Sequence, residues 1–176
     1  MMTGVFEVNS VEETWALARR FASELKPGDV VCLEGDLGAG KTTFTQGLAA
    51  ALGVAGRVTS PTFCLVQEHR GKIIESTNNR IIESDKGNAM SDDSPHSTNR
   101  QIDHSIISPF LLVHMDLYRL HSEDDVLAIG WEDYLAEGAI LVVEWPERAG
   151  SLIPPTAKHI VFTHLDGDER RRLAFA

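Results

Sequence analysis

A glycine-rich segment followed by a lysine and a threonine has the residue types and spacing of a phosphate-binding loop. Residues 35–42 read Gly-Asp-Leu-Gly-Ala-Gly-Lys-Thr, which matches the pattern G-x-x-x-x-G-K-[ST] at every fixed position. Glycines let the backbone wrap a phosphate chain without Cβ clashes, so successive amides point at the phosphate oxygens. In such loops the lysine, here Lys41, reaches the β- and γ-phosphates, and the hydroxyl of Thr42 ligates Mg²⁺. The residues expected to meet the nucleotide here are Asp36, Leu37, Gly38, Ala39, Gly40, Lys41, Thr42 and Thr43.

The residues on either side of this loop predict the strand and the helix that it needs. Residues 29–33 are short, apolar and rich in β-branched side chains, which is typical of a buried parallel strand. Residues 42–52 repeat apolar side chains at helical spacing and end at Gly53. A further helix is predicted over residues 14–25. This order of helix, strand, glycine loop and helix indicates an α/β fold.

A nucleotide site of this kind also needs an acid at the end of a neighbouring apolar strand, where it handles Mg²⁺. Two carboxylates fit this pattern. Asp116 follows the run 110–115, which is apolar except for His114, and Glu144 follows the apolar run 139–143. The alternative for each is a solvated carboxylate at a strand end. The sequence leaves open which acid meets the ion and which orients the attacking water.

Two further positions are candidates for nucleotide-dependent roles. Ser60-Pro61-Thr62 lies between the loop and the first acid, where switch-type NTPases place a hydroxyl that senses the γ-phosphate, although such a segment by itself predicts only a turn. Trp145 directly follows Glu144 and either stacks on a base or a partner or caps the core. The chain lacks Asn-Lys-x-Asp, with which GTPases read guanine, so ATP is the expected nucleotide.

The candidates thus fall into three groups, which overlap. The catalytic candidates are Lys41, Asp116, Glu144 and Thr62; the metal-ligand candidates are Thr42, Glu144 and Asp116; and Trp145 joins the loop residues as a cofactor-binding candidate.

Composition limits the function further. The chain has 176 residues, with 16 basic and 26 acidic side chains and a formal charge of −10. A length of this order favours one domain, and a 43% hydrophobic content is enough for a buried core. The negative charge argues against a protein whose main affinity is for nucleic acid phosphates or for an anionic membrane. No apolar run approaches the roughly 18 residues of a membrane span, and no secretory signal is recognisable, so we expect a cytoplasmic protein.

Residues 70–109 differ in character from the rest of the chain. They are dominated by Ser, Asn, Asp, Arg and His, with few large apolar groups and no periodicity. Segments of this length inside a compact domain are normally functional or disordered. We predict a single domain over residues 1–176, with 70–109 forming a disordered or weakly ordered insertion within it.

Four segments, occurring together and in order, resemble one protein family. They are Gly-Asp-Leu-Gly-Ala-Gly-Lys-Thr-Thr-Phe (35–44), Ser-Pro-Thr-Phe (60–63), Met-Asp-Leu-Tyr-Arg-Leu (115–120) and Val-Glu-Trp-Pro-Glu (143–147). Over about residues 5–69 and 110–155, the chain resembles the TsaE (YjeE) family, the ATPase component of tRNA threonylcarbamoyladenosine biosynthesis.

This resemblance implies a P-loop NTPase-like α/β fold, a three-layer sandwich with a mixed, largely parallel central sheet. It implies binding of ATP and Mg²⁺ and slow hydrolysis. The implied partners are TsaD and TsaB, whose complex places a threonylcarbamoyl group on N6 of adenosine 37 in tRNAs reading codons that begin with A, so that tRNA is met only indirectly. The resemblance matches Thr62 to a switch-like threonine, Asp116 to the Walker B acid and Glu144-Trp145 to a Glu-Trp pair near the nucleotide. The segment 70–109 departs from the family, whose usual members have a short connection there.

Two other functions stay open at this point. One is a stand-alone small-molecule kinase that uses the same loop, and the other is a nucleotide-dependent binding module without significant turnover. The two strand-end acids and the family motifs favour the accessory ATPase.

Overall fold

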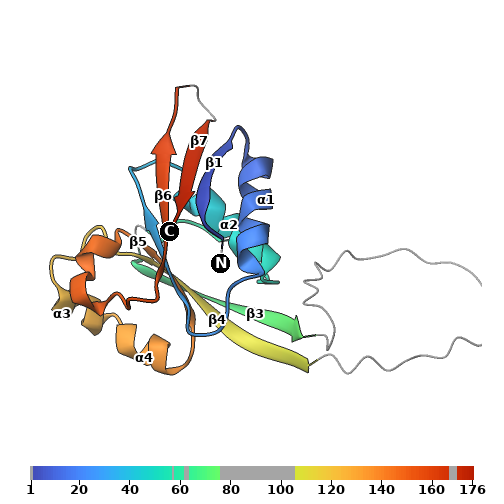
Figure 1. The fold of residues 1–176 in the computed structure, drawn as a ribbon. Helices are drawn as coiled ribbons and strands as arrows, with labels where there is room; N and C mark the ends of the chain where they lie inside the picture. The colour runs from blue at the N-terminus through green and yellow to red at the C-terminus, as the bar shows by residue number, and fades with distance from the viewer. Residues whose placement is uncertain (1, 57, 62–63, 76–105, 167–169) are drawn as a thin grey trace, which may run out of the picture.

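The structure is a computed structural model that describes residues 2–56, 58–61, 64–75, 106–166 and 170–176, without the side chains of 72–75 and 106–108. Within these ranges seven strands form a single sheet, in the order β1-β7-β6-β2-β5-β4-β3 (Figure 1). The strands are β1 (Gly4–Val8), β2 (Val30–Glu34), β3 (Val66–Glu75), β4 (Ile106–Asp116), β5 (Ile140–Glu144), β6 (Lys158–His164) and β7 (Arg171–Phe175).

The centre of the sheet is parallel and its edges are antiparallel. β2 runs parallel to both of its neighbours, β5 and β6, and β4 runs parallel to β5 on the far side. β7 and β1 extend one edge and β3 extends the other, and each of these pairings is antiparallel. This mixed sheet confirms the predicted α/β class and the sheet type that the family resemblance implied.

Helices cover both faces of the sheet, so the fold has three layers. α1 (Val11–Ala22) and α2 (Lys41–Ala51) lie on one face, and α3 (Glu123–Ala128) and α4 (Trp131–Ala136) lie on the other. The short 3₁₀ turns η1 (Pro146–Arg148) and η2 (Gly150–Leu152) follow β5. None of the described helices is long and apolar enough to cross a membrane.

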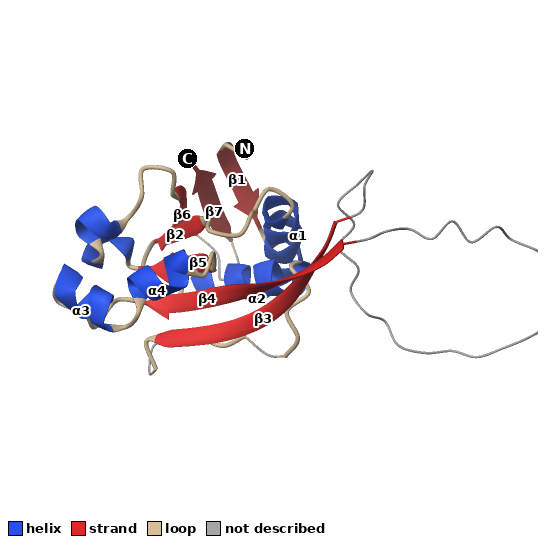
Figure 2. Ribbon diagram, turned by 90° about the horizontal axis from the view of Figure 1, so that it is seen from below, coloured by secondary structure: helices blue, strands red, loops and turns tan. Residues whose placement is uncertain are grey.

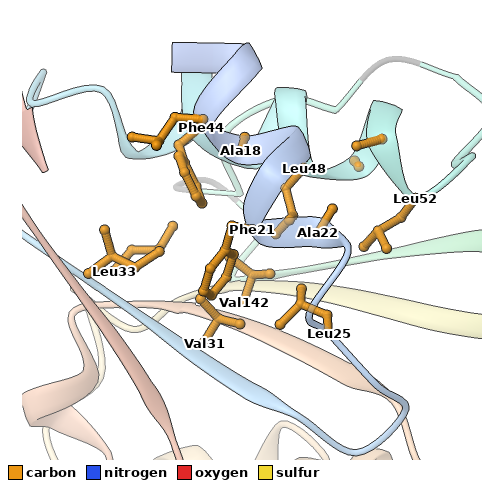
Figure 3. Packing of buried hydrophobic residues seen from close by; sticks show 14 of the residues in the cluster. Ala18, Phe21, Ala22, Leu25, Val31, Leu33, Phe44, Leu48, Leu52 and Val142 are labelled. Atoms are coloured by element: carbon orange, nitrogen blue, oxygen red, sulfur yellow. The ribbon is translucent and has the colours of Figure 1, made fainter. Parts of the chain in front are cut away.

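The strands β2 and β5 are apolar on both faces up to their final glutamates, because both faces are covered. In β2, Val31 and Leu33 enter the core under α1 and α2, whereas Val30 and Cys32 enter the core on the opposite face. Figure 3 shows Phe21 of α1 and Phe44 of α2 packed over the sheet residues of the core on that face. The rings of Phe21 and Phe44 lie 6.0 Å apart between centroids. This packing holds α2, the helix that begins at the end of the glycine loop, against the rest of the core.

Side-chain caps begin two of the helices. The hydroxyl of Ser10 accepts a hydrogen bond from the Glu13 backbone N–H at the start of α1. Ser122 accepts from the Asp125 backbone N–H at the start of α3, and the Asp125 carboxylate accepts in return from the Ser122 N–H, which completes a capping box. Such caps satisfy backbone donors that a helix leaves unpaired at its first turn.

β3 and β4 form a long antiparallel hairpin that projects beyond the rest of the sheet (Figure 2). Its pairing runs from Val66 opposite Met115 to Glu75 opposite Ile106. Residues 70–75 and 106–109 are therefore strand, although the sequence assigned them to the insertion. The reason is that each strand is specified by a partner more than thirty positions away, which local periodicity does not reveal. The remainder of the predicted insertion, 76–105, lies outside the described residues.

Replacing residues 76–105 by an Asn-Gly turn is expected to leave a folded chain. Glu75 and Ile106 are opposite each other at the end of the hairpin, and a two-residue turn of this type joins such a pair. Closing a shorter loop also costs less chain entropy. Urea unfolding of the shortened chain should remain cooperative, with a midpoint no lower than that of the full chain. Loss of the cooperative transition would show that the deleted segment belongs to the core.

Candidate nucleotide-binding site

The glycine-rich loop connects β2 directly to α2. Gly35, Gly38 and Gly40 adopt φ values of 135°, 79° and 101°, which only glycine takes without strain. Gly35 has a second constraint, because a Cβ built on it would lie 2.5 Å from the carbonyl oxygen of Phe162 in β6. The glycines thus allow the loop to turn sharply while it passes close to the neighbouring strand.

The ammonium group of Lys41 lies within the loop. Its Nζ donates to the carbonyl oxygens of Gly35 at 2.6 Å and Asp36 at 3.0 Å. The same atom lies 3.8 Å from Oε2 of Glu144 and 5.1 Å from the centroid of the Trp145 ring. The side chain is buried, so this positive charge sits in a site of reduced dielectric, where it attracts anions more strongly than it would in water.

The two strand-end carboxylates lie side by side. Asp116, the last residue of β4, is opposite Glu144, the last residue of β5, in the parallel pairing of these strands. On its other side β5 pairs with β2, and there Glu144 is opposite Leu33, close to the start of the loop. Both acids are buried. The fold therefore places Lys41, Asp116 and Glu144 at the same end of the sheet, at the carboxyl ends of its parallel strands. This is where α/β folds bind ligands.

Backbone hydrogen bonds hold the end of β4 in place. The Asp116 N–H donates to the carbonyl oxygen of Leu65 at 2.9 Å, and the Leu117 N–H donates to that of Glu144 at 3.1 Å. Oδ1 of Asp116 accepts from the Tyr118 N–H at 3.1 Å. These contacts fix the position of the Asp116 carboxylate relative to the end of β5.

The sequence did not assign a role to His114, which contacts one of the acids. Its Nε2 lies 2.9 Å from Oε1 of Glu144, and its side chain is fully buried. The only sequence signal was a histidine that interrupts an apolar strand two positions before Asp116.

Burial shifts the pKa of two other groups in the sheet, one in the central strand β2 and one in the edge strand β3. Burial in β2, assisted by the charge of Glu34, raises the pKa of the Cys32 thiol to about 12. In β3, burial lowers the pKa of His69, and the neighbouring His114 lowers it further. Cys32 is therefore protonated and unreactive at neutral pH.

Trp145 lies between the glycine loop and the core on the α3 and α4 face of the sheet. It takes a left-handed conformation with φ of 60°, and its ring centroid is 4.9 Å from that of Tyr118. The ring also packs against the core on the α3 and α4 face. Trp145 therefore packs on the core within reach of Lys41, and its stacking on a base or a partner stays a prediction.

The remaining candidates are placed as follows. Thr42 and Thr43 are partly buried in the first turn of α2, Ala39 is buried, and Asp36 and Gly38 are exposed. Leu37 at the loop tip is 89% exposed. Thr62 lies outside the described residues.

One further residue, from the basic run near residue 171, lies beside the loop. Arg171 in β7 has its Cγ and Nε 3.9 Å from the position that a Cβ on Gly40 would occupy. The two residues are far apart in the sequence, so only the tertiary structure reveals that they lie close together.

Comparisons with known proteins identify the family and agree with this fold. The family model described as "Threonylcarbamoyl adenosine biosynthesis protein TsaE" matches residues 8–86 and 97–173. The tRNA threonylcarbamoyladenosine biosynthesis protein TsaE of Bacillus subtilis is 33% identical over 164 residues, which are 93% of this chain and 79% of that protein. The protein of the same name from Aquifex aeolicus is 37% identical over 143 residues, covering 80% of this chain and 75% of that one.

A solved structure shows the same architecture. The crystal structure of YdiB from Bacillus subtilis superposes with a TM-score of 0.60 at 28% identity, covering 99% of this chain and 86% of that chain. The fold and the glycine loop define a P-loop protein of the α/β class. The chain belongs to the TsaE family of tRNA threonylcarbamoyladenosine biosynthesis, as its motifs predicted. The family match also extends further than we expected, since within 70–109 it omits only residues 87–96.

Gly35→Ala is expected to destabilise the fold more than Gly28→Ala, which serves as its matched control. Both glycines have positive φ, so both substitutions introduce backbone strain. A Cβ at Gly28 has no atom within 4 Å, whereas one at Gly35 meets the Phe162 carbonyl oxygen. The added overlap should cost at least about 1 kcal/mol more in the free energy of unfolding, measured with urea. Equal losses for the two variants would contradict the close approach of the loop to β6.

Proposed function

We propose that this chain binds ATP with Mg²⁺ and hydrolyses it slowly, and that this activity supports threonylcarbamoyl transfer to N6 of adenosine 37 through the TsaD–TsaB complex. One observation carries the proposal: Lys41, Asp116 and Glu144 meet at the edge of the sheet where the phosphate-type loop begins. If the Lys41–Glu144 pair served only to stabilise the fold, it would not need a glycine-rich loop around the lysine. Together these groups form an anion site next to a pair of oxygen ligands.

The donor set fits a magnesium nucleotide. The loop amides and the Lys41 ammonium suit phosphate oxygens, and the N-terminus of α2 adds a favourable field. The metal-ligand candidates are Thr42, Asp116 and Glu144, whose hydroxyl and carboxylate oxygens are the ligands that Mg²⁺ prefers. The bound ion would neutralise charge on the phosphates.

The chain's own residues divide the work as follows. Lys41 now donates to two loop carbonyls, and it replaces these hydrogen bonds with contacts to the β- and γ-phosphates when the nucleotide binds. Asp116 and Glu144 share two tasks, holding the water shell of the ion and orienting the attacking water, whose proton a carboxylate accepts. Thr62 is the family's match for the hydroxyl that senses the γ-phosphate. Trp145 completes the wall of the site.

A protein complex is a better partner for this chain than tRNA itself. The net charge is −10, and only −1 of it comes from the 5 basic and 6 acidic residues of 70–109, so the remaining surface is acidic and disfavours phosphate backbones. Two apolar side chains beside the site, Leu37 and Tyr118, are 89% and 53% exposed. Exposed apolar and aromatic groups of this kind are typical of protein interfaces.

Lys41→Ala is expected to weaken binding of MgATP by about 10- to 150-fold, because a charge-assisted hydrogen bond contributes ~1.5–3 kcal/mol. Isothermal titration calorimetry measures this directly. Lys26→Ala is the matched control, since it removes an exposed lysine with the same change in charge. Unchanged affinity in Lys41→Ala would refute the assignment of the loop to phosphate binding.

ATP hydrolysis by the purified chain is expected to be slow alone and to rise when purified TsaD and TsaB are added. Phosphate release over time is the measurement, and Asp116→Asn should suppress the stimulated rate. Transfer of phosphate to a metabolite in the absence of the partners would instead support a small-molecule kinase. Binding of ATP with no turnover under either condition would support a binding module.

A further inference from the structure

His114 is a buried polar residue in a strand that is otherwise built for the core. It lies in β4 between Val113 and Met115, and its side chain has no exposed surface. An imidazole removed from water in this way is costly unless it makes a hydrogen bond. Among the residues that the structure describes, its side-chain hydrogen-bond partner is Glu144, a residue of the candidate site.

The contact divides the Glu144 carboxylate between two neighbours. Oε1 lies 2.9 Å from Nε2 of His114, whereas Oε2 lies 3.8 Å from Nζ of Lys41. The first distance is that of a hydrogen bond and the second is too long for one. One oxygen is therefore held from inside the sheet, and the other faces the glycine loop.

The hydrogen bond also determines where the imidazole carries its proton. A carboxylate only accepts, so Nε2 must be the donor. Nδ1 of His114 is buried and makes no hydrogen bond within the part of the chain that the structure describes. The ring is thus hydrogen-bonded to Glu144 through one nitrogen, and burial of the whole side chain leaves it little freedom to turn.

We propose that His114 is a positioning residue, whose Nε2–H fixes the rotamer of Glu144 so that Oε2 is presented to the bound nucleotide. This inference rests on the proposed function, because it is there that Glu144 acts. Buried groups that orient a catalytic or metal-binding side chain in this way commonly matter 10- to 100-fold for activity.

The same hydrogen bond protects Lys41. Without a donor on Oε1, the carboxylate would be free to turn both oxygens toward the ammonium group that lies 3.8 Å away. A close Lys41–Glu144 pair would neutralise the lysine that the loop presents to phosphate. His114 therefore keeps the Glu144 carboxylate from pairing closely with the Lys41 ammonium group while both remain buried.

The test compares His114→Leu, which removes the donor, with His114→Gln, whose side-chain amide restores one. In the presence of the partner proteins, His114→Leu should lower kcat about 10- to 100-fold and change KM for MgATP less than threefold, and His114→Gln should recover most of the loss. His69→Leu is the control, because it removes a partly buried imidazole from the adjacent strand β3. It should keep the kcat of the parent chain.

A double-mutant cycle separates positioning from general packing. If His114 acts through Glu144, adding His114→Leu to Glu144→Gln should lower kcat little further. An equal fold-loss in both backgrounds would overturn the proposal, as would a His114→Gln variant no more active than His114→Leu. If His114→Leu does not unfold cooperatively, two other measurements provide the test. They are the kcat of His114→Gln relative to the parent chain and the ¹H–¹⁵N spectrum described in the next paragraph.

A measurement on the protein without nucleotide keeps this inference distinct from the proposed function. In a ¹H–¹⁵N spectrum of histidine-labelled protein, we expect a slowly exchanging ring proton on Nε2 that is absent in both His114 variants and shifted in Glu144→Gln. A proton on Nδ1 of His114, or no change in Glu144→Gln, would overturn the positioning role. Absence of ATP turnover in the parent chain, with this signal present, would instead overturn the proposed function alone.

Discussion

The register of three parallel strands is the constraint on which the candidate site depends. Leu33 in β2 is opposite Glu144 in β5, and Glu144 is opposite Asp116 in β4, so the three strands end within one residue of each other. Side chains alternate along a strand, and a slip of one residue would turn one of the acids into the opposite layer. The covering helices stabilise this register, because they bury apolar residues on both faces of the same strands.

A second constraint is electrostatic. A buried ammonium group lies 3.8 Å from one buried carboxylate, and a second buried carboxylate is opposite the first in the sheet, although isolated buried charges are unfavourable. The structure satisfies them with directed contacts: loop carbonyls for Lys41, His114 for Glu144 and a backbone N–H for Asp116. These contacts hold opposite charges near each other without full pairing. Such an arrangement is suited to a ligand that carries both phosphates and a cation.

The local parts of the molecule were predictable, and the parts made by distant pairing were not. The glycine loop, the strand before it and the helix after it were predicted from contiguous residues, because turn, strand and helix preferences are short-range. The β3–β4 hairpin was missed at its outer end, where a polar sequence pairs with a strand more than thirty residues away. The contact of Arg171 with the loop was missed for the same reason.

The sequence by itself determined the type of loop, the two acids that could serve it and the family to which the chain belongs. Those conclusions required only residue identity and spacing within short segments. The tertiary structure decided that both acids lie at the same end of the sheet, that Trp145 packs on the core beside Lys41, and that His114 contacts Glu144. These depend on strand order and register, which arise from hydrogen bonds between segments that are remote in the chain.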